Sequence, residues 1–138
     1  MARIIDKRKE AHLERLLTKA QLDTNVLAVL LFGSLARQEQ TPTSDIDVCL
    51  VLLPQIEPFD QTKLSRKRLD YLKEFSLDVQ IFQQLPLYVR RRVLKDGQIL
   101  FVRDERLLYK VACRTAQAFE DFKHIYYGYL KEVDAVGS

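Results

Sequence analysis

Cysteine, long apolar runs and net charge are all scarce in this sequence, and each scarcity excludes a class of protein. The two cysteines among the 138 residues, Cys49 and Cys113, lie far apart and match neither a zinc-ligand spacing nor a disulfide framework. We expect both to be buried, reduced thiols. The longest unbroken apolar run, Val26 to Phe32, is far too short to cross a bilayer, and the start of the chain lacks the apolar run of a signal peptide. The sequence therefore predicts no membrane contact and a cytoplasmic location.

The charges of the chain nearly balance, which limits the class of partner. There are 22 Lys and Arg residues against 19 Asp and Glu residues, a formal net charge of +3. This excess predicts no direct nucleic-acid binding, although a local phosphate site would fit it. A length of 138 residues, with 47% hydrophobic and 30% charged residues, is that of one ordinary globular domain, and no repeat or linker divides it. We therefore expect a single domain that spans residues 1–138.

Apolar residues recur with helical and strand periods in alternation along the chain. Helices are predicted at about residues 4–21, 60–74, 86–94 and 104–133, and strands at 26–32, 45–53, 77–82 and 98–102. The first strand is apolar on both faces, which is typical of a central strand that is covered on both sides. Strands that alternate with helices indicate an α/β or α+β domain, with a small mixed β-sheet, flanking helices and a long C-terminal helix.

Two acidic side chains open the predicted second strand and carry the strongest chemical signal. Because strand side chains alternate, Asp45 and Asp47 point to the same face. Two carboxylates on one face repel each other unless a cation lies between them, and Mg²⁺ prefers such oxygen ligands. Asp78, on the less apolar face of the third strand, approaches them if that strand pairs beside the second. Two alternatives stay open: Asp45 and Asp47 are solvated residues at the edge of the sheet, and Asp78 pairs with a lysine.

A glycine–serine pair follows the buried strand, where the sequence predicts the start of a short helix. Gly33 lets a ligand approach the backbone closely, and the free N–H groups of a helix N-terminus attract an anion. Ser34 can cap that helix or donate its hydroxyl to a phosphate, and Arg37 can pair with phosphate oxygens one turn further on. If the first two strands are neighbours, a phosphate site and a metal site meet at one edge of the sheet.

Together these residues resemble the signature of a known enzyme family. Gly33-Ser34, ten intervening residues and Asp45-x-Asp47, with Asp78 on the next strand, are similar to the pattern of the DNA polymerase β-type nucleotidyltransferase superfamily. The compact length most resembles the minimal nucleotidyltransferases (MNT), the antitoxins of HEPN–MNT toxin–antitoxin pairs. The resemblance implies a polymerase β-like nucleotidyltransferase fold and the transfer of a nucleoside monophosphate from a nucleoside triphosphate to a hydroxyl, with release of pyrophosphate.

The resemblance also implies a role for each residue of the pattern. Asp45 and Asp47 would bridge two Mg²⁺ ions, and Asp78 would complete the catalytic metal site. The nucleotide-binding residues would be Gly33, Ser34 and Arg37. For the MNT group, the resemblance implies ATP as the AMP donor and a tyrosine of a HEPN toxin as the acceptor, which silences the toxin. Two other functions stay open: an antibiotic-type nucleotidyltransferase with a small-molecule acceptor, and a non-catalytic toxin-binding module.

The predicted C-terminal helix carries an apolar seam with the spacing of a heptad repeat. Its residues are Leu108, Ala112, Thr115, Phe119, Phe122, Tyr126, Tyr129 and Val133. A helix of this length extends about 45 Å, whereas the domain should measure about 30 Å across, so we expect part of the helix to overhang. The seam either packs entirely on its own domain, or its aromatic half docks on another subunit. A HEPN toxin and a second copy of the chain, in a homo-oligomer, both satisfy the second alternative.

Two basic clusters invite a nucleic-acid interpretation. Arg90-Arg91-Arg92 falls on a short predicted helix, where three consecutive side chains point in different directions around the axis. The other cluster, on the helix predicted at 60–74, consists of Lys63, Arg66, Lys67, Arg68 and Lys73. We expect both to be solvated helix faces, with contacts to a phosphate or an acidic partner as the second alternative.

Overall fold

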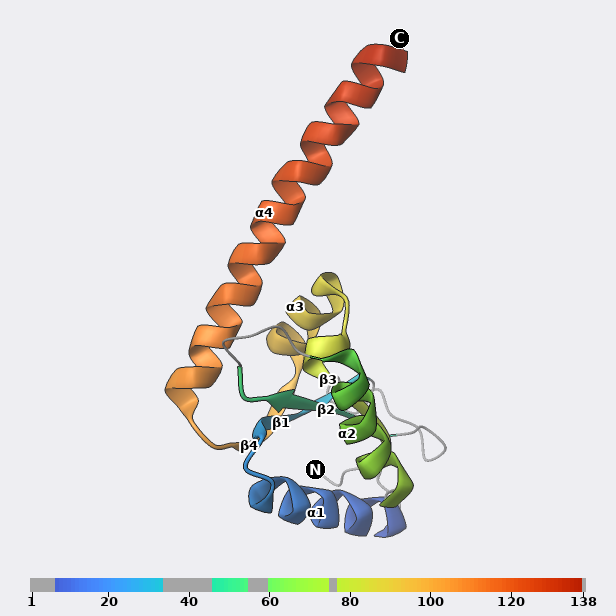
Figure 1. Cartoon of the computed structure of the whole chain (residues 1–138), viewed down its shortest axis with the longest axis vertical. Helices are drawn as coiled ribbons and strands as arrows, with labels where there is room; N and C mark the ends of the chain where they lie inside the picture. The colour runs from blue at the N-terminus through green and yellow to red at the C-terminus, as the bar shows by residue number, and fades with distance from the viewer. Residues whose placement is uncertain (1–6, 34–45, 55–59, 75–76, 138) are drawn as a thin grey trace.

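A computed structural model describes residues 7–33, 46–54, 60–74 and 77–137 of the chain, and Figure 1 shows its arrangement. The helices are α1 (Lys7–Leu22), α2 (Gln61–Glu74), α3 (Leu87–Asp96) and α4 (Glu105–Gly137), with one turn of 3₁₀-helix, η1, at Phe82–Gln84. The strands are β1 (Val26–Phe32), β2 (Asp47–Leu52), β3 (Asp78–Ile81) and β4 (Gln98–Val102). Each helix and strand except η1 corresponds to one that the apolar periodicity predicts.

The four strands form one mixed sheet in the order β3-β2-β1-β4. The central strand β1 is antiparallel to both β2 and β4, whereas β2 and β3 are parallel. The mixed sheet and the long C-terminal helix confirm the predicted fold class. Two predicted ends are wrong: Phe82 begins η1 instead of ending β3, and α3 continues to Asp96, where Gly97 caps it by donating its N–H to the carbonyl of Val93.

Two helices cover each face of the sheet, so the domain has three layers (Figure 1). On one face, α1 and α2 contribute Leu16 and Leu64 to a buried core. On the other face, α3 and α4 contribute Val93 and Val111 to a second core. The side chains of β1 from Val26 to Leu31 are buried on both faces, which confirms the prediction that this apolar strand is central.

The basic face of α2 is not simply solvated. Lys67 Nζ lies 2.8 Å from Asp23 Oδ2, and Arg68 Nε donates a 2.8 Å hydrogen bond to the carbonyl of Val79. Tyr71 is fully buried, and its hydroxyl donates to Asp23 Oδ2 at 3.1 Å. The expectation of a solvated face is therefore wrong for Lys67 and Arg68, because these side chains anchor α2 to the α1–β1 turn and to β3.

Acid should weaken the contact between α2 and the α1–β1 turn. Burial alone would raise the pKa of Asp23, but hydrogen bonds from Lys67, the Asn25 N–H and Tyr71, together with the Lys67 charge, lower this pKa overall. A carboxyl with a lowered pKa stabilises the folded state above about pH 4, and this stabilisation is lost as the pH falls through the folded-state pKa. We expect Asp23→Asn to lower the free energy of unfolding at pH 7 by about 1–3 kcal/mol and to flatten its decline below pH 4, as measured by urea unfolding.

A surface carboxylate supplies the control for this prediction. Asp70 lies 3.1 Å from Lys19, but its side chain is 59% exposed. Asp70→Asn should change the free energy of unfolding by no more than about 0.5 kcal/mol. Equal effects of the two substitutions would show that the Asp23 network does not hold α2.

The two cysteines differ in their surroundings. Cys49 is buried in the sheet, and this burial raises the pKa of its thiol to about 12. Cys113 is exposed on α4, so the expectation that both thiols are buried is wrong for Cys113. No helix within the described ranges combines the length and the hydropathy needed to cross a bilayer.

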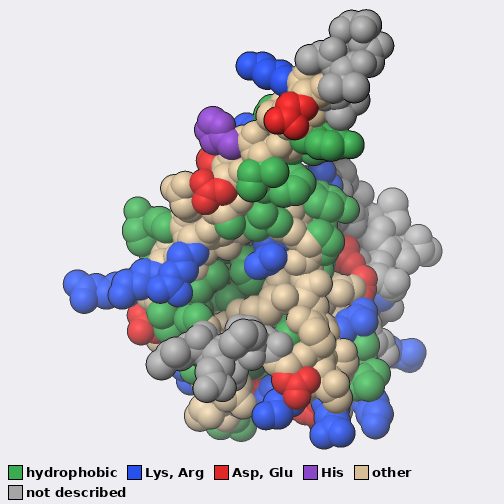
Figure 2. Space-filling view, turned by 45° about the horizontal axis from the view of Figure 1, so that its top comes forward, with side chains coloured by type: hydrophobic (Ala, Val, Ile, Leu, Met, Phe, Trp, Pro, Cys, Tyr) green, Lys and Arg blue, Asp and Glu red, His purple; other side chains and the backbone are tan. Residues whose placement is uncertain are grey.

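Only the first half of α4 packs on the domain. Leu108, Val111 and Thr115 are buried, and the guanidinium of Arg91 lies 4.6 Å from the ring centroid of Phe119. Beyond Phe119 the helix projects away from the sheet (Figure 1), and Figure 2 shows hydrophobic side chains along the projecting part. The predicted overhang is therefore confirmed, and packing of the whole seam on its own domain is wrong.

Candidate active site

Two of the predicted carboxylates are direct neighbours in the sheet. Asp47 opens β2 and Asp78 opens β3, and the parallel register pairs these two residues with each other. Adjacent strands lie about 4.8 Å apart, so the two side chains start from neighbouring backbone positions. Cys49, two residues after Asp47, belongs to the core under α3 and α4, so both carboxylates lie on that face of the sheet. Asp45 lies outside the described residues.

The position of Asp78 depends on its neighbours in and beside β3. Its N–H donates a 3.0 Å hydrogen bond to the carbonyl of Ile46, just before β2. Gln80, two residues on and on the same face, donates from Nε2 to Asp78 Oδ1 at 3.1 Å. Within the described part of the chain, the Asp78 carboxylate thus accepts from an amide and not from a lysine. Gln80 is absent from the predicted site, although its alternation with Asp78 signals a shared face.

Gly33 ends β1 in a conformation that suits glycine. Its φ is 79°, in the left-handed region. A Cβ atom built on Gly33 would overlap the carboxylate of Asp47, so this side chain lies directly against the glycine backbone. The register also pairs Phe32 with Asp47 across β1 and β2. The structure therefore brings Gly33 and the carboxylates to one corner of the sheet, as predicted, while Ser34 and Arg37 lie outside the described residues.

A hollow of about 170 Å³ opens beside this corner, under α3. Its lining residues are Phe32, Gly33, Val89, Arg92, Val93 and Asp96. Gly33 belongs both to the hollow and to the contact with Asp47, so the two features adjoin. Nothing in the sequence analysis predicts this hollow, because it depends on how α3 crosses the sheet.

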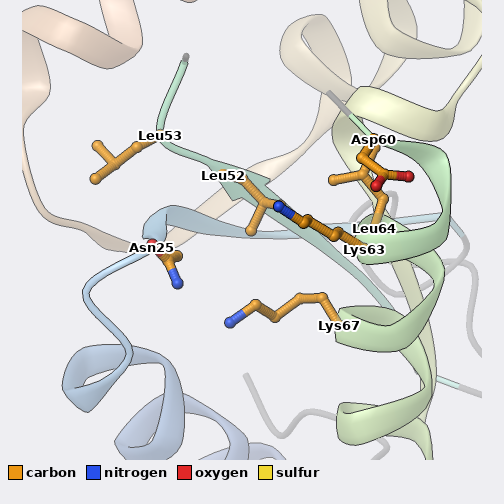
Figure 3. Close-up of a pocket in the computed structure, with 7 residues that line it drawn as sticks. All are labelled: Asn25, Leu52, Leu53, Asp60, Lys63, Leu64 and Lys67. Carbon is orange, nitrogen blue, oxygen red and sulfur yellow. The ribbon is translucent and has the colours of Figure 1, made fainter. Parts of the chain in front are cut away.

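A second hollow, of about 160 Å³, lies by the far end of β2, where α2 begins. Figure 3 shows Lys63 and Lys67 reaching from α2 across this end of the sheet. Lys67 is already bound to Asp23, and Asp60 accepts a 2.9 Å hydrogen bond from the N–H of Thr62 in the first turn of α2. These polar groups hold α2 in place, and the hollow contains none of the predicted site residues.

The paired carboxylates have the donor chemistry that a magnesium site requires. Hard divalent cations take carboxylate oxygens as ligands, and a cation between Asp47 and Asp78 would relieve the repulsion of two adjacent negative charges. The described residues hold no cluster of three potential metal ligands, and the third predicted carboxylate, Asp45, falls outside them. The two described carboxylates therefore fit Mg²⁺ as part of a ligand set.

The sequence match agrees with this geometry. Residues 14–106, more than half of the chain, match the family model described as polymerase beta, nucleotidyltransferase. The chain belongs to the polymerase beta nucleotidyltransferase family. The matched range includes Asp47, Asp78 and Gly33, and all the residues that line the hollow under α3.

Known proteins resemble this chain in sequence and in structure. Over 79 residues it is 34% identical to a protein of Methanocaldococcus jannaschii that is named as a candidate protein adenylyltransferase. The aligned segment is 56% of this chain and 57% of that protein, so the chain spans little more than half the length of this relative.

Two solved structures share the fold. A chain from the crystal structure of a toxin–antitoxin complex with AMP-PNP has a TM-score of 0.60 at 18% identity, over 87% of this chain and 97% of that chain. A chain from the complex of a tri-AMPylated Shewanella oneidensis HEPN toxin with its MNT antitoxin has a TM-score of 0.59 at 14% identity, over 91% and 98% of the two chains. These similarities confirm the predicted polymerase β-like fold.

Proposed function

We propose that this chain is a magnesium-dependent nucleotidyltransferase that moves AMP from ATP to a protein hydroxyl. The pairing of Asp47 with Asp78, against the backbone of Gly33, carries the proposal. Within the polymerase beta nucleotidyltransferase family, this corner is where the sequence pattern predicts polyphosphate and metal. The chain acts as a single minimal nucleotidyltransferase domain, in the cytoplasm, where its two unpaired cysteines stay reduced.

Three carboxylates would hold the metal ions. Asp45, Asp47 and Asp78 would be the carboxylates that hold the Mg²⁺ ions, as the resemblance implies. When bound, the ions neutralise charge on the triphosphate and lower the pKa of the attacking hydroxyl. Gly33 leaves room for the triphosphate beside Asp47, and Ser34 and Arg37 bind its phosphate oxygens.

The proposed reaction is a displacement at the α-phosphorus of ATP. The acceptor oxygen attacks the α-phosphorus, the bond to the β-phosphate oxygen breaks, and pyrophosphate leaves. Asp78 is held in place by Gln80 through Oδ1, which leaves Oδ2 to accept the proton of the attacking hydroxyl or to bind metal. The adjacent Asp47 approaches the same position from β2.

A HEPN-type toxin is the acceptor that the comparisons support best, and the resemblance implies a tyrosine as the residue that receives AMP. Two structural relatives come from toxin–antitoxin complexes, and in one of these the HEPN toxin carries AMP groups. The M. jannaschii relative is named for protein adenylyl transfer. Adenylylation would silence the toxin, so this chain would act as the antitoxin.

The mass of the partner after co-expression tests this function. We expect a HEPN-domain protein to be encoded beside this chain. It is expressed alone and together with the chain, and intact masses are compared. We expect the co-expressed partner to gain one or more AMP groups. A tight complex whose partner gains no mass would instead support the non-catalytic toxin-binding module.

The projecting part of α4 is the expected contact surface for this partner. Phe122, Tyr126 and Tyr129 are 54%, 49% and 62% exposed, on the continuation of the helix face that packs on the domain. Aromatic side chains are favoured anchors at interfaces. We expect the double substitution Phe122→Ala/Tyr126→Ala to weaken partner binding by at least about 100-fold, as measured by surface plasmon resonance.

A substitution on the opposite face of α4 is the matched control. His124 is exposed there, and His124→Ala should leave the affinity within about threefold. Light scattering on the chain alone shows whether this surface binds a second copy of the chain instead of the toxin. A dimer that the double substitution dissociates would assign the surface to self-association.

A further inference from the structure

The three consecutive arginines of α3 have different environments, and one of them lies beside the active-site corner. Arg91 contacts the ring of Phe119 on α4, as described above. Arg92 instead lines the hollow that Gly33 also lines. Arg91 and Arg92 are exposed, as expected for a solvated helix face, whereas Arg90 is half-buried and its Nε atom is buried. Figure 1 shows α3 lying over the sheet on the side away from α1. The two carboxylates lie on this side because Asp47 alternates with Cys49, which belongs to the core under α3 and α4.

The hollow has the chemistry of a nucleobase site. Its walls are apolar, from Phe32, Val89 and Val93, and its two charged residues, Arg92 and Asp96, are one helical turn apart. Binding pockets for planar organic groups combine apolar walls with a few polar groups that fix orientation. The volume of about 170 Å³ is below the roughly 300–1,000 Å³ of pockets for drug-sized ligands, so it suits one ring system and not a whole nucleotide.

Arg92 and Asp96, the two charged residues of the hollow, are both exposed to solvent. Neither makes a hydrogen bond or an ion pair within the described part of the chain. Asp96 is the last residue of α3, where a negative charge is unfavourable because the C-terminal end of a helix is already partly negative. Asp96 is exposed at this position, so it does not stabilise α3 and its carboxylate is open to a ligand.

The hollow also lies at the right place for the base of a bound nucleotide. Phe32 pairs with Asp47 across neighbouring strands, whose backbones lie about 4.8 Å apart. Gly33 touches both the hollow and the Asp47 carboxylate. A base in the hollow would thus leave its phosphates beside the carboxylates.

We propose that the hollow binds the adenine ring of ATP and that Asp96 and Arg92 read its N6–N7 edge. Adenine presents a donor at N6 and an acceptor at N7 on this edge, whereas guanine presents two acceptors, O6 and N7. The Asp96 carboxylate accepts from N6, and the Arg92 guanidinium donates to N7. A purine with oxygen at position 6 would instead place that oxygen against the carboxylate. This inference rests on the proposed function and adds its base specificity.

Calorimetric titration of the full chain with ATP, ITP and inorganic triphosphate, each with Mg²⁺, tests the proposal. ITP carries oxygen in place of the N6 amino group, and inorganic triphosphate has no base. We expect the wild-type chain to bind ATP at least about tenfold more tightly than ITP. Asp96→Ala should weaken ATP binding about tenfold, the loss expected for a hydrogen bond to a charged group, and leave inorganic triphosphate unchanged.

Variants on α3 control for general effects of charge. Arg92→Gln should weaken ATP binding, whereas Lys95→Gln removes an exposed positive charge that does not line the hollow and should change nothing. Asp96→Ala should also raise the melting temperature slightly, because it removes an acid from the helix C-terminus.

The possible failures are distinguishable. An unchanged ratio of ATP to ITP affinity in Asp96→Ala would overturn the proposal alone, and so would equal losses for ATP and inorganic triphosphate, which would indicate a phosphate site. A wild-type chain that binds none of the three would overturn the proposed function as well.

Discussion

Replacing Asp47 with asparagine is expected to lower AMP transfer by at least about 10³-fold while the chain keeps its fold. Asp47 lies between Gly33 and Asp78, so it contributes to the contact with both the triphosphate and the metal ions. Loss of a metal-binding carboxylate removes several kcal/mol of transition-state stabilisation. The rate is measured as label transferred from ATP labelled at the α-phosphate to the HEPN partner.

The melting temperature provides the internal control for this substitution. Because Asp47 and Asp78 are adjacent like charges, removing one of them should leave the melting temperature unchanged or raise it. Asp78→Asn should behave in the same way, whereas the exposed Asp70→Asn should retain full transfer. Full transfer by Asp47→Asn would remove this residue from the active site.

Gly33→Ala is expected to reduce AMP transfer by at least about 100-fold, far more than its effect on stability would explain. A positive φ of 79° costs an alanine roughly 1–2 kcal/mol. The added Cβ would also overlap the carboxylate of Asp47. That carboxylate is the end of a flexible side chain and can turn away, so the fold survives while the site loses its geometry. Transfer rates and urea unfolding of the same variant separate the two effects.

Another glycine in the chain offers the matched control. A Cβ at Gly128, within α4, would meet no atom within 4 Å. Gly128→Ala should stabilise the chain by up to about 1 kcal/mol, because alanine favours the helix. If the unfolded fraction of Gly33→Ala accounts for its whole loss of transfer rate, the glycine has only a structural role.

Local patterns predict the central strand and the alternation of elements because those depend on neighbouring residues. Val26 to Phe32 is apolar throughout and ends at a glycine, so its length and its burial follow directly. The environment of Tyr71 depends instead on how α2 meets the α1–β1 turn. Similarly, Arg103, after β4, donates to the carbonyls of Ala20 and Val26, a contact across about 80 residues that no local pattern shows.

The sequence predicts which residues form the site, but their contacts depend on the order of the strands in the sheet. The alternation of β2 and β3 indicates which faces Asp47 and Asp78 occupy, but their adjacency required the parallel pairing that the structure shows. No local pattern predicts the hollow under α3, because it forms only where Phe32 and Asp96, far apart in the sequence, come together. Asp45, Ser34 and Arg37 remain predictions from the motif.

The central claim is that this corner transfers a nucleotide rather than a phosphate. The most direct measurement incubates the chain, Mg²⁺ and the HEPN partner with ATP labelled at either the α- or the γ-phosphate. We expect the α-label to remain on the partner and the γ-label to leave in pyrophosphate. Retention of the γ-label, or no label from either ATP, would contradict the account.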